Sequence, residues 1–444
     1  MYRRRWRKRW KRNGESDLSN QSTSQPVNQT MSNQSIRPLS RKLDKIALST
    51  TTVLNERAMA MRRDGHEVYN FAVGEPDFST PDHIKEAGIS AIRQNNTKYT
   101  PAVGTMDLKE AICEKLARDN GLEYSPAQIA TTSGGKHALY NVLSVLCNEG
   151  DEVIVPAPYW VSYPEMVKLV DADPVIIETN ADTSFKITPD QLRSAITSKT
   201  KALMLNTPSN PTGMVYTRDE LEVIAKIALD TGIYVISDEL YEKILYDGLT
   251  HDSIAAVHPQ MIKQTIIVNG LSKAYAMTGW RLGYAAGPQS VIDLVVKFQG
   301  QTVMHPSAIT QFAGITALNG SEDFIPPMVE AFKHRRDYIL GRFADMSGVT
   351  CIKPGGAFYV FPDLSSYIGY YTPGGDRIEG SLDLAMYLLD SFHVVSVPGI
   401  AFGSEGCIRL SYATSMDIIK QGLDGIEEGL ASLKQVHPVP ACTP

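Results

Sequence analysis

The sequence predicts an α/β protein in which a mostly parallel sheet lies between helices. From about residue 80 to 300, short apolar runs rich in Val and Ile alternate with stretches of helical spacing. Strands that are apolar on both faces are typical of a parallel sheet covered by helices. The apolar runs also tend to end in unusual polar residues. In such sheets ligands bind beyond the carboxyl ends of the strands, so the pattern also indicates where a site should form.

The individual elements follow from these patterns. Strands are expected at 128–133, 152–158, 173–179, 201–208, 234–239 and 264–272, and helices at 136–147 and 218–230. From about residue 325 the pattern changes to a long charged helix over 330–345, followed by short strands and helices. We interpret this part as a second, smaller α+β unit that residues 40–75 complete.

Composition excludes several classes of protein. The chain has 444 residues, of which 43% are hydrophobic and 21% charged, without an apolar run of about 18 residues, so no membrane span is expected. The five cysteines form no C-x-x-C pair, which indicates reduced thiols in a cytoplasmic protein and no metal site. The net charge of −6 combines +7 in residues 1–40 with −13 in the rest. An acidic body argues against nucleic acid as a partner.

The first 36 residues are expected to be a disordered arm. A basic run, MYRRRWRKRWKR, precedes a Ser/Asn/Gln-rich stretch, and neither offers enough apolar surface to offset the entropy of ordering. An organelle transit peptide, weak adhesion to membrane or nucleic acid through Trp6 and Trp10, and a true start at Met31 stay open as alternatives to a cytoplasmic protein with a passive arm.

The most informative motif is NGLSKAYAMTGWRLGY at 269–284. It places Ser272, Lys273 and Arg281 within ten residues at the end of a predicted strand. A lysine beside a hydroxyl, with an arginine eight positions later, suits a covalently held, phosphate-bearing cofactor. Lys273 would form a Schiff base, and Ser272 and Arg281 would bind phosphate oxygens. Taken alone, such a lysine is usually an ordinary surface residue.

Two further motifs follow predicted strands. In SGGKHA at 133–138, paired glycines that include Gly135 let backbone N–H groups approach an anion at a helix N-terminus, although helix packing also explains them. In SDELY at 237–241, Asp238 is either a helix cap or a buried carboxylate that keeps a pyridine nitrogen protonated. Tyr241 and Asn210 would donate to the 3′-oxygen of a pyridoxal ring, and Trp160 is either core packing or a stacking surface for that ring.

Arg409 lies among apolar residues in EGCIRLSYA at 405–413, on a predicted strand. A guanidinium in such a position needs a partner. We consider two: an acidic side chain in a buried ion pair, and the α-carboxylate of a substrate held in bidentate fashion.

Together these residues resemble the fold-type I, class I aminotransferases, most closely their bacterial and plastid aspartate and prephenate subgroup. The likeness runs from about residue 40 to 435 and rests on nine motifs in order. They are AVGEPDF, TKYTPAVG, SGGKHA, PYWVSYPE, NTPSNPTG, SDELYE, LSKAYAMTGWRLGY, GGAFY and IRLSYA. The resemblance implies pyridoxal 5′-phosphate as cofactor and a mostly parallel, seven-stranded sheet in a large cofactor-binding domain at 79–322. It also implies a small domain at 323–437, which residues 37–78 join.

The resemblance assigns further roles. Gly74 would contact substrate through its backbone, and Tyr99 would reach the cofactor phosphate of a neighbouring subunit, which implies a homodimer with shared active sites. Lys136, helped by Thr51, would bind the distal carboxylate of a dicarboxylic substrate; a simple role beside the phosphate is the alternative for Lys136. The family pattern is broken at two positions. His137 stands where glutamine is common, and Gly270 stands where some relatives have a phosphate-binding serine.

The expected reaction is transamination between aspartate or glutamate and 2-oxo acids, namely 2-oxoglutarate and oxaloacetate, with prephenate as a further candidate acceptor. Freed from the cofactor, Lys273 would serve as the general base at the substrate Cα. A C–S lyase or another amino-acid lyase on the same fold is the main alternative, because a fold does not fix a reaction. A regulator with a retired enzyme domain is the other, but 40 polar residues cannot form a helix-turn-helix unit.

Overall fold

The computed structural model describes residues 40–46 and 50–436. The expectations for residues 1–36 concern a segment outside the described residues, and the domain boundaries at 78/79 and 322/323 stay predictions. Among the described helices, none combines the length and the apolar character needed to cross a bilayer.

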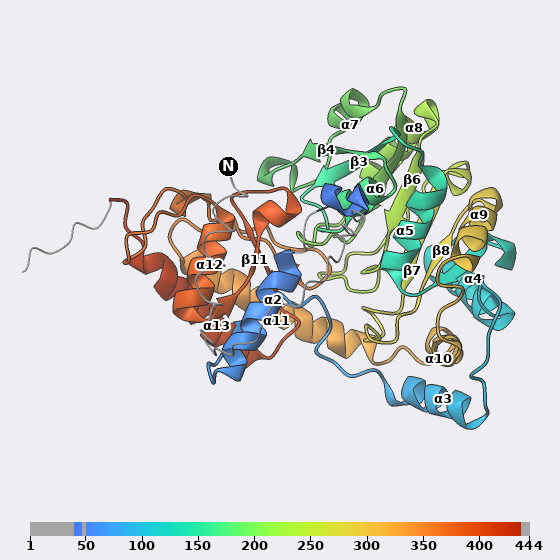
Figure 1. Cartoon of the computed structure of the whole chain (residues 1–444), viewed down its shortest axis with the longest axis horizontal. Helices are drawn as coiled ribbons and strands as arrows, with labels where there is room; N and C mark the ends of the chain where they lie inside the picture. Colours follow the sequence, from blue (N-terminus) through green and yellow to red (C-terminus); the bar gives the residue numbers. More distant parts are fainter. Residues whose placement is uncertain (1–39, 47–49, 437–444) are drawn as a thin grey trace, which may run out of the picture. The chain divides into compact units, whose positions relative to one another are not determined.

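The central feature is a seven-stranded sheet with the order β2-β8-β7-β6-β5-β3-β4 (Figure 1). Six strands are mutually parallel, whereas β8 runs antiparallel to both of its neighbours, β2 and β7. The predicted mostly parallel sheet is therefore confirmed. Its strands are β2 (Ile129–Thr132), β3 (Glu152–Ala157), β4 (Asp173–Glu178), β5 (Thr200–Asn206), β6 (Tyr234–Asp238), β7 (Thr265–Gly270) and β8 (Gly283–Ala286).

The four-residue strand β8 was not among the predicted strands. Its sequence, GYAA, overlaps the end of the lysine motif and contains no β-branched residue. Tyr284 is its only residue of high strand propensity, so its composition marks it only weakly as a strand. It is held by its two neighbours in the sheet. Its register with β7 pairs Gly270 with Gly283, which brings the lysine motif back against the end of β7.

Helices cover both faces of this sheet, as the apolar character of the strands requires. Within β6, Ile236 packs in the cluster that contains the side chains of α5, α6 and α9, whereas Val235 packs in the cluster of α7 and α8. The helices of this part are α3 (Asp82–Arg93), α4 (Met106–Asn120), α5 (Gly135–Leu146), α6 (Tyr163–Leu169), α7 (Pro189–Ala195), α8 (Arg218–Thr231), α9 (Gln289–Gly300) and α10 (Ala308–Asn319).

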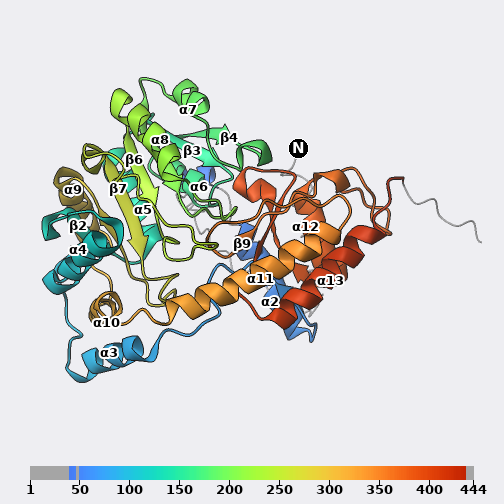
Figure 2. The same cartoon turned by 180° about the vertical axis from the view of Figure 1, so that it is seen from behind.

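The second part contains a three-stranded antiparallel sheet, β11-β12-β9, and a pair of parallel strands, β1-β10. Figure 2 shows the predicted long helix, α11, running alongside α13. The elements are α2 (Thr50–Arg63), β1 (Tyr69–Asn70), α11 (Ile325–Asp345), β9 (Tyr359–Val360), α12 (Ser381–Phe392), β10 (Val394–Val395), β11 (Val397–Pro398), β12 (Ile408–Ser411) and α13 (Met416–Ser432). Short 3-10 turns occur at Arg41–Lys45, Pro126–Gln128, Ala181–Thr183, Met261–Lys263, Ser365–Tyr367 and Gly399–Phe402.

The polar motifs lie at the carboxyl ends of the strands, as predicted. Asn206 and Asp238 are the last residues of β5 and β6, and these two positions are paired across the sheet. Lys273 lies three residues beyond the end of β7. Because these strands are parallel neighbours, their ends meet at one edge of the sheet and bring the motifs together.

Candidate active site

Lys273 is the amine at the centre of the candidate site. Its Nζ donates to the backbone carbonyl of Gly74 at 2.5 Å and lies 5.7 Å from the ring centre of Tyr241. Burial, together with the positive charge of Arg409, lowers the pKa of Lys273 to about 8, against the weaker opposing pull of Glu75 and Asp238. A lysine with such a pKa is partly unprotonated near neutral pH, which a nucleophilic amine and a general base both require.

Asp238 is a buried carboxylate whose side chain meets only neutral donors. Its Oδ2 accepts from the hydroxyl of Tyr163 at 2.6 Å, and its Oδ1 accepts from the backbone N–H of Leu240 at 3.3 Å. Burial raises the pKa of Asp238 to about 6, although the hydrogen bond from Tyr163 acts against the rise. A turn follows β6 at this point, so the helix-cap interpretation is wrong for Asp238.

Arg409 lies on β12 and is 4% exposed. Its guanidinium donates to the side-chain carbonyl of Asn210 at 3.1 Å and to the backbone carbonyl of Ala72 at 2.7 Å, while its Nε has no partner in the described part of the chain. It stacks 4.6 Å from the ring centre of Tyr359. No acidic side chain among the described residues pairs with Arg409, so the ion-pair interpretation fails and a buried cation is left for a ligand.

The glycine loop and Arg281 form the predicted anion site. Gly134 is the N-cap of α5 with φ of +90°, and a Cβ there would lie 2.4 Å from the Arg281 guanidinium. Arg281 donates to the carbonyl of Ser133 at 3.3 Å, so strand end and arginine are held together. Ser272 is 5% exposed and has no hydrogen-bond partner among the described residues. The N-terminus of α5, the guanidinium of Arg281 and the hydroxyl of Ser272 are together suited to bind a phosphate.

The two departures from the family pattern have visible structural consequences. A Cβ on Gly270 would lie 2.8 Å from the carbonyl oxygen of Leu282, so no side chain fits there without a shift of backbone. His137 accepts the backbone N–H of Ser133 through Nδ1 at 3.1 Å. The backbone N–H of Ser133, which belongs to the glycine loop, is therefore already bonded to the imidazole of His137.

The remaining predicted residues of the site surround these charges. Lys136 places its Nζ 4.7 Å from the ring centre of Trp160, and burial together with Arg281 lowers the pKa of Lys136. The hydroxyls of Tyr241 and Tyr359 are 2.8 Å apart. A continuous set of contacts therefore links five residues, namely Lys273, Tyr241, Tyr359, Arg409 and Asn210. Gly135 is the first residue of α5.

Neither Tyr99 nor Thr51 is brought to the site by a contact in the described part of the chain. Tyr99 is 85% exposed and meets only His305, at 5.8 Å between ring centres, so its side chain lies on the surface of the single chain. Thr51 belongs to the first turn of α2, but its side chain lies outside what the structure describes. Gly74 does reach the site, because its carbonyl accepts from Lys273.

Sequence reasoning missed two residues of the site. Tyr163 holds Asp238, and Tyr359 stacks on Arg409. Both lie in motifs that carried the resemblance, PYWVSYPE and GGAFY, but nothing about a single tyrosine shows which charge it will meet. The signal for Tyr163 was its position three residues after Trp160, at the start of a helix.

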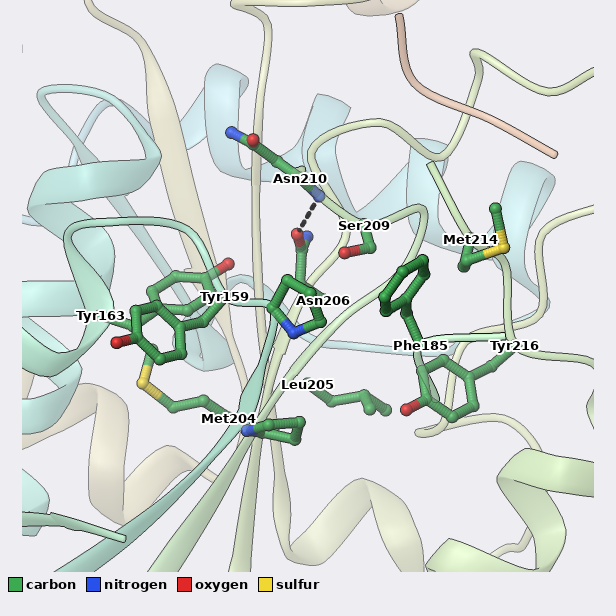
Figure 3. A pocket seen from close by; sticks show the side chains of 12 residues that line it. Tyr159, Tyr163, Phe185, Met204, Leu205, Asn206, Ser209, Asn210, Met214 and Tyr216 are labelled. Atoms are coloured by element: carbon green, nitrogen blue, oxygen red, sulfur yellow. Dashed lines mark hydrogen bonds between the residues drawn. The ribbon is translucent and has the colours of Figure 1, made fainter. Parts of the chain in front are cut away.

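Two cavities border the site. One, of about 30 Å³, is lined by Tyr163, Asn206 and Asn210 among others, a volume that suits water rather than an amino acid. Figure 3 shows the side chain of Asn210 directed away from this cavity, while its backbone N–H donates to Asn206 at 2.8 Å. The other, of about 710 Å³, is a depression that is open to the surface and is lined by Ser133, Arg281 and neighbouring residues. It leaves ample space beside the anion site.

The donor set therefore fits a phosphorylated aromatic aldehyde. It offers an amine of lowered pKa, a phosphate site, a buried carboxylate for a ring nitrogen and hydroxyls for a ring oxygen. Residues 66–426 match the family model of aminotransferase class I and II.

Individual relatives indicate the same family. An aspartate aminotransferase of Geobacillus stearothermophilus is 44% identical over 87% of this chain and 98% of its own. A bifunctional aspartate aminotransferase and glutamate/aspartate-prephenate aminotransferase of Petunia hybrida is 45% identical over 90% of this chain and 84% of its own. The crystal structure of the aspartate aminotransferase of Rhizobium meliloti matches with a TM-score of 0.87 and 40% identity, covering 90% of this chain and all of that one. The chain therefore belongs to the class I and II aminotransferases, and it is an aminotransferase enzyme.

Proposed function

We propose that this aminotransferase binds pyridoxal 5′-phosphate at Lys273 and moves amino groups between aspartate or glutamate and 2-oxo acids. The acceptors are 2-oxoglutarate and oxaloacetate, and prephenate is included as a further acceptor. Relatives support the substrate class: several are named aspartate aminotransferase, and one from Cereibacter sphaeroides, 43% identical over 89% of this chain and 99% of its own, is named aspartate/prephenate aminotransferase.

The observation that carries the proposal is a buried arginine without an acid. The positive charge of Arg409 lowers the pKa of Lys273, and the described residues give Arg409 no carboxylate. Burying such a charge is unfavourable unless a ligand pairs with it. An α-carboxylate fits the guanidinium in bidentate fashion and would place the substrate Cα near the amine of Lys273.

Each residue has a role in that reaction. The bound cofactor supplies an electron sink for the electrons released at the substrate Cα. Arg409 fixes the substrate carboxylate, so that the Cα–H bond is the one held for cleavage. Lys273 would take the proton from Cα and deliver it to the cofactor, and it would carry out the reverse transfer when the 2-oxo acid is converted to an amino acid. Asp238 holds a proton at the ring nitrogen, and the hydroxyl of Tyr241 binds the ring oxygen.

Lys136 supports a preference for dicarboxylic substrates. Its Nζ sits over Trp160 beside the site, and no described acidic side chain pairs with it. A second carboxylate on the substrate would meet this ammonium group. A related structure, the aspartate aminotransferase of Thermus thermophilus with maleate, is 40% identical with a TM-score of 0.83, covering 88% of this chain and all of that one. Maleate is itself a dicarboxylate.

Tyr99 supports a homodimer with shared sites. Its ring is almost fully exposed in the single chain, yet it lies on a loop whose backbone is fixed by buried side chains. An aromatic residue held in place without burial is suited to contact a second copy. We propose that it reaches the anion site of that copy.

Steady-state assays test the proposal. Aspartate, glutamate, alanine and phenylalanine are offered as donors with 2-oxoglutarate, oxaloacetate and prephenate as acceptors, and the absorption spectrum of the purified protein is recorded. We expect a yellow protein that uses dicarboxylic donors at least tenfold better than monocarboxylic ones, as a charge-assisted contact of about 1.5–3 kcal/mol implies.

Two results would contradict the proposal. A colourless protein that takes up no added pyridoxal phosphate would show that this chain does not bind the cofactor. Release of ammonia and a 2-oxo acid without any acceptor would instead indicate the lyase alternative.

A further inference from the structure

A cluster of buried charged side chains lies behind the strand ends that form the site. We call Lys115, Glu239, Glu242 and His251 the rear cluster. Their side chains are 2%, 0%, 8% and 6% exposed. Glu239 follows Asp238 directly, and successive side chains at the end of a strand point to opposite faces of the sheet. Asp238 therefore faces the site through Tyr163, whereas Glu239 faces the rear cluster.

Glu239 is held on three sides. Its Oε1 accepts from the hydroxyls of Ser237 at 2.8 Å and Ser253 at 2.7 Å. Its Oε2 lies 3.1 Å from Nε2 of His251, an ionic distance without hydrogen-bond geometry, and neither ring nitrogen of His251 has a hydrogen-bond partner among the described residues. Its backbone N–H donates to the carbonyl of Val268 on β7 at 2.9 Å. Glu239 therefore ties the end of β6 to the loop of residues 251–253 and to β7.

Glu242 is held to a second strand end. It pairs with Lys115 on α4 and accepts from the side-chain amide of Asn269 at 2.8 Å. The carbonyl of that amide accepts the backbone N–H of Gly270 at 2.7 Å, three residues before Lys273. Asn120 adds a further donor at 2.9 Å. Glu242 therefore fixes the end of β7, from which the chain leads to Lys273.

The charges of the rear cluster balance when His251 carries a proton. Two carboxylates then face two cations, Lys115 and His251. With a neutral imidazole, the rear cluster would carry a net charge of −1 and Glu239 would have no cation as a partner, which is unfavourable for a buried carboxylate. Ligand atoms of Glu239, Glu242 and His251 do lie within 4.8 Å of one another, a spacing that a metal ion also accepts. A divalent ion beside Lys115 would leave excess positive charge, whereas a proton leaves none.

We propose that the rear cluster positions Asp238 and Lys273 from the opposite face of the sheet, and that a proton on His251 keeps it charge-balanced. Its members are positioning residues, because they act through the two strand ends and touch neither substrate nor cofactor. This inference rests on the proposed function for its catalytic consequence, but its proton balance is a property of the chain alone.

The groups that face His251 explain its ionisation. Burial alone would lower the pKa of His251. The negative charge of Glu239, its close approach to the imidazole and the charge of Glu242 together raise this pKa, and the charge of Lys115 opposes the rise. The hydroxyls of Tyr124 and Tyr284 also feel Glu239, and burial raises the pKa of both phenols, so they stay neutral. A histidine with a raised folded-state pKa adds stability below its unfolded value of about 6.5. That stability is lost as pH rises through the folded-state pKa.

The test compares His251→Gln with His258→Gln as the matched control, because His258 is exposed and lies outside the rear cluster. Thermal stability of the cofactor-free proteins is measured from about pH 6 to 9. We expect H251Q to be less stable than wild type, with a gap that is widest at the acid end and narrows as pH rises. H258Q should follow wild type throughout. A gap that does not vary with pH would contradict the proton balance.

Two further readouts keep the test decisive. Nuclear magnetic resonance of ring-labelled histidines, without cofactor, should show one imidazole that titrates above the usual value and shifts downward in Glu239→Gln. In the cofactor-loaded enzyme, H251Q should lower kcat about 10- to 100-fold with KM for aspartate within about twofold of wild type, because a small displacement of reacting groups has that effect. Unchanged kcat, or a stoichiometric metal ion in the purified protein, would overturn the inference. Inactive wild type with the expected titration would instead count against the proposed function.

Discussion

The two faces of the sheet at the strand ends differ in whether their buried charged side chains have ionic partners. On the site face, Arg409 meets no carboxylate, Asp238 meets only neutral donors, and Lys273 meets a carbonyl oxygen. On the rear face, Glu242 is paired with Lys115 and Glu239 with His251. The pKa values follow this difference: that of Asp238 is raised to about 6, whereas that of Glu242 is lowered to about 2.

One short segment of the chain carries both kinds of buried carboxylate. The segment SDELYE carries Asp238 for a ligand and, four residues later, Glu242 for the scaffold. Burial by itself would raise the pKa of both carboxyls; the charges of Lys115 and His251 reverse that effect for Glu242 alone. Buried charges without protein partners mark where a ligand binds, and paired ones mark what holds the binding site in shape.

The largest effect is expected at the amine. Lys273→Ala removes the nucleophile and the general base together, so transamination should fall by about 10⁴-fold or more. Lys297→Ala, which changes an exposed lysine on α9, is the control and should keep full activity. The measurement is kcat with aspartate and 2-oxoglutarate. Substantial turnover by K273A would place the reacting amine elsewhere.

Arg409→Met should affect kinetics next most strongly. Loss of a buried charge partner for the substrate carboxylate typically costs about 2–5 kcal/mol, so kcat/KM should fall by about 30-fold or more. Arg342→Met serves as the control, because Arg342 already has two acidic partners, Asp424 and Glu427, on the protein surface. Equal losses in the two variants would break the distinction between partnered and unpartnered arginines.

Lys136→Met tests the second cation of the site face. Without the ammonium group, kcat/KM for aspartate should fall by about 10- to 100-fold, and kcat/KM for phenylalanine should stay level or rise. The ratio of the two substrates is the measurement, so an overall loss of folded enzyme does not disturb it. A ratio equal to that of wild type would assign Lys136 to the phosphate instead.

The lowered pKa of Lys273 predicts a pH dependence of cofactor uptake. Only the neutral amine attacks an aldehyde, so the rate of uptake by the cofactor-free protein should rise with pH and level off above about 8, the pKa of Lys273. Below that pH the rate should drop by about tenfold per unit. Stopped-flow absorbance measures it. A midpoint near 10.5, the ordinary value for lysine, would show that burial and Arg409 do not act as described.

Much of this site could be predicted from the sequence, because its residues lie in short motifs at the ends of apolar runs. Lys273, Asp238 and Arg409 were all identified that way. What could not be predicted is whether each charge has a partner, because partners come from distant elements. Lys115 meets Glu242 across 127 positions, and Asn210 meets Arg409 across 199. Strand β8 escaped prediction for a related reason, since its neighbours in the sheet, and not its composition, hold it in place.

The most direct test exchanges one carboxylate for a carboxamide on each face. Asp238→Asn removes a buried charge that lacks an ionic partner, so the cofactor-free protein should become more stable at pH 7, by roughly 3 kcal/mol if the whole raised pKa is relieved. Its folded-state pKa is raised, so the wild type should recover the difference as pH falls through about 6.

Glu242→Gln should do the reverse. It leaves Lys115 buried without a carboxylate, and breaking such a pair typically costs about 3–5 kcal/mol. The measurement is the free energy of unfolding of the two cofactor-free variants relative to wild type at pH 7. Opposite signs, with D238N stabilised and E242Q destabilised, are predicted; a shift of the same sign in both would contradict the distinction between the two faces.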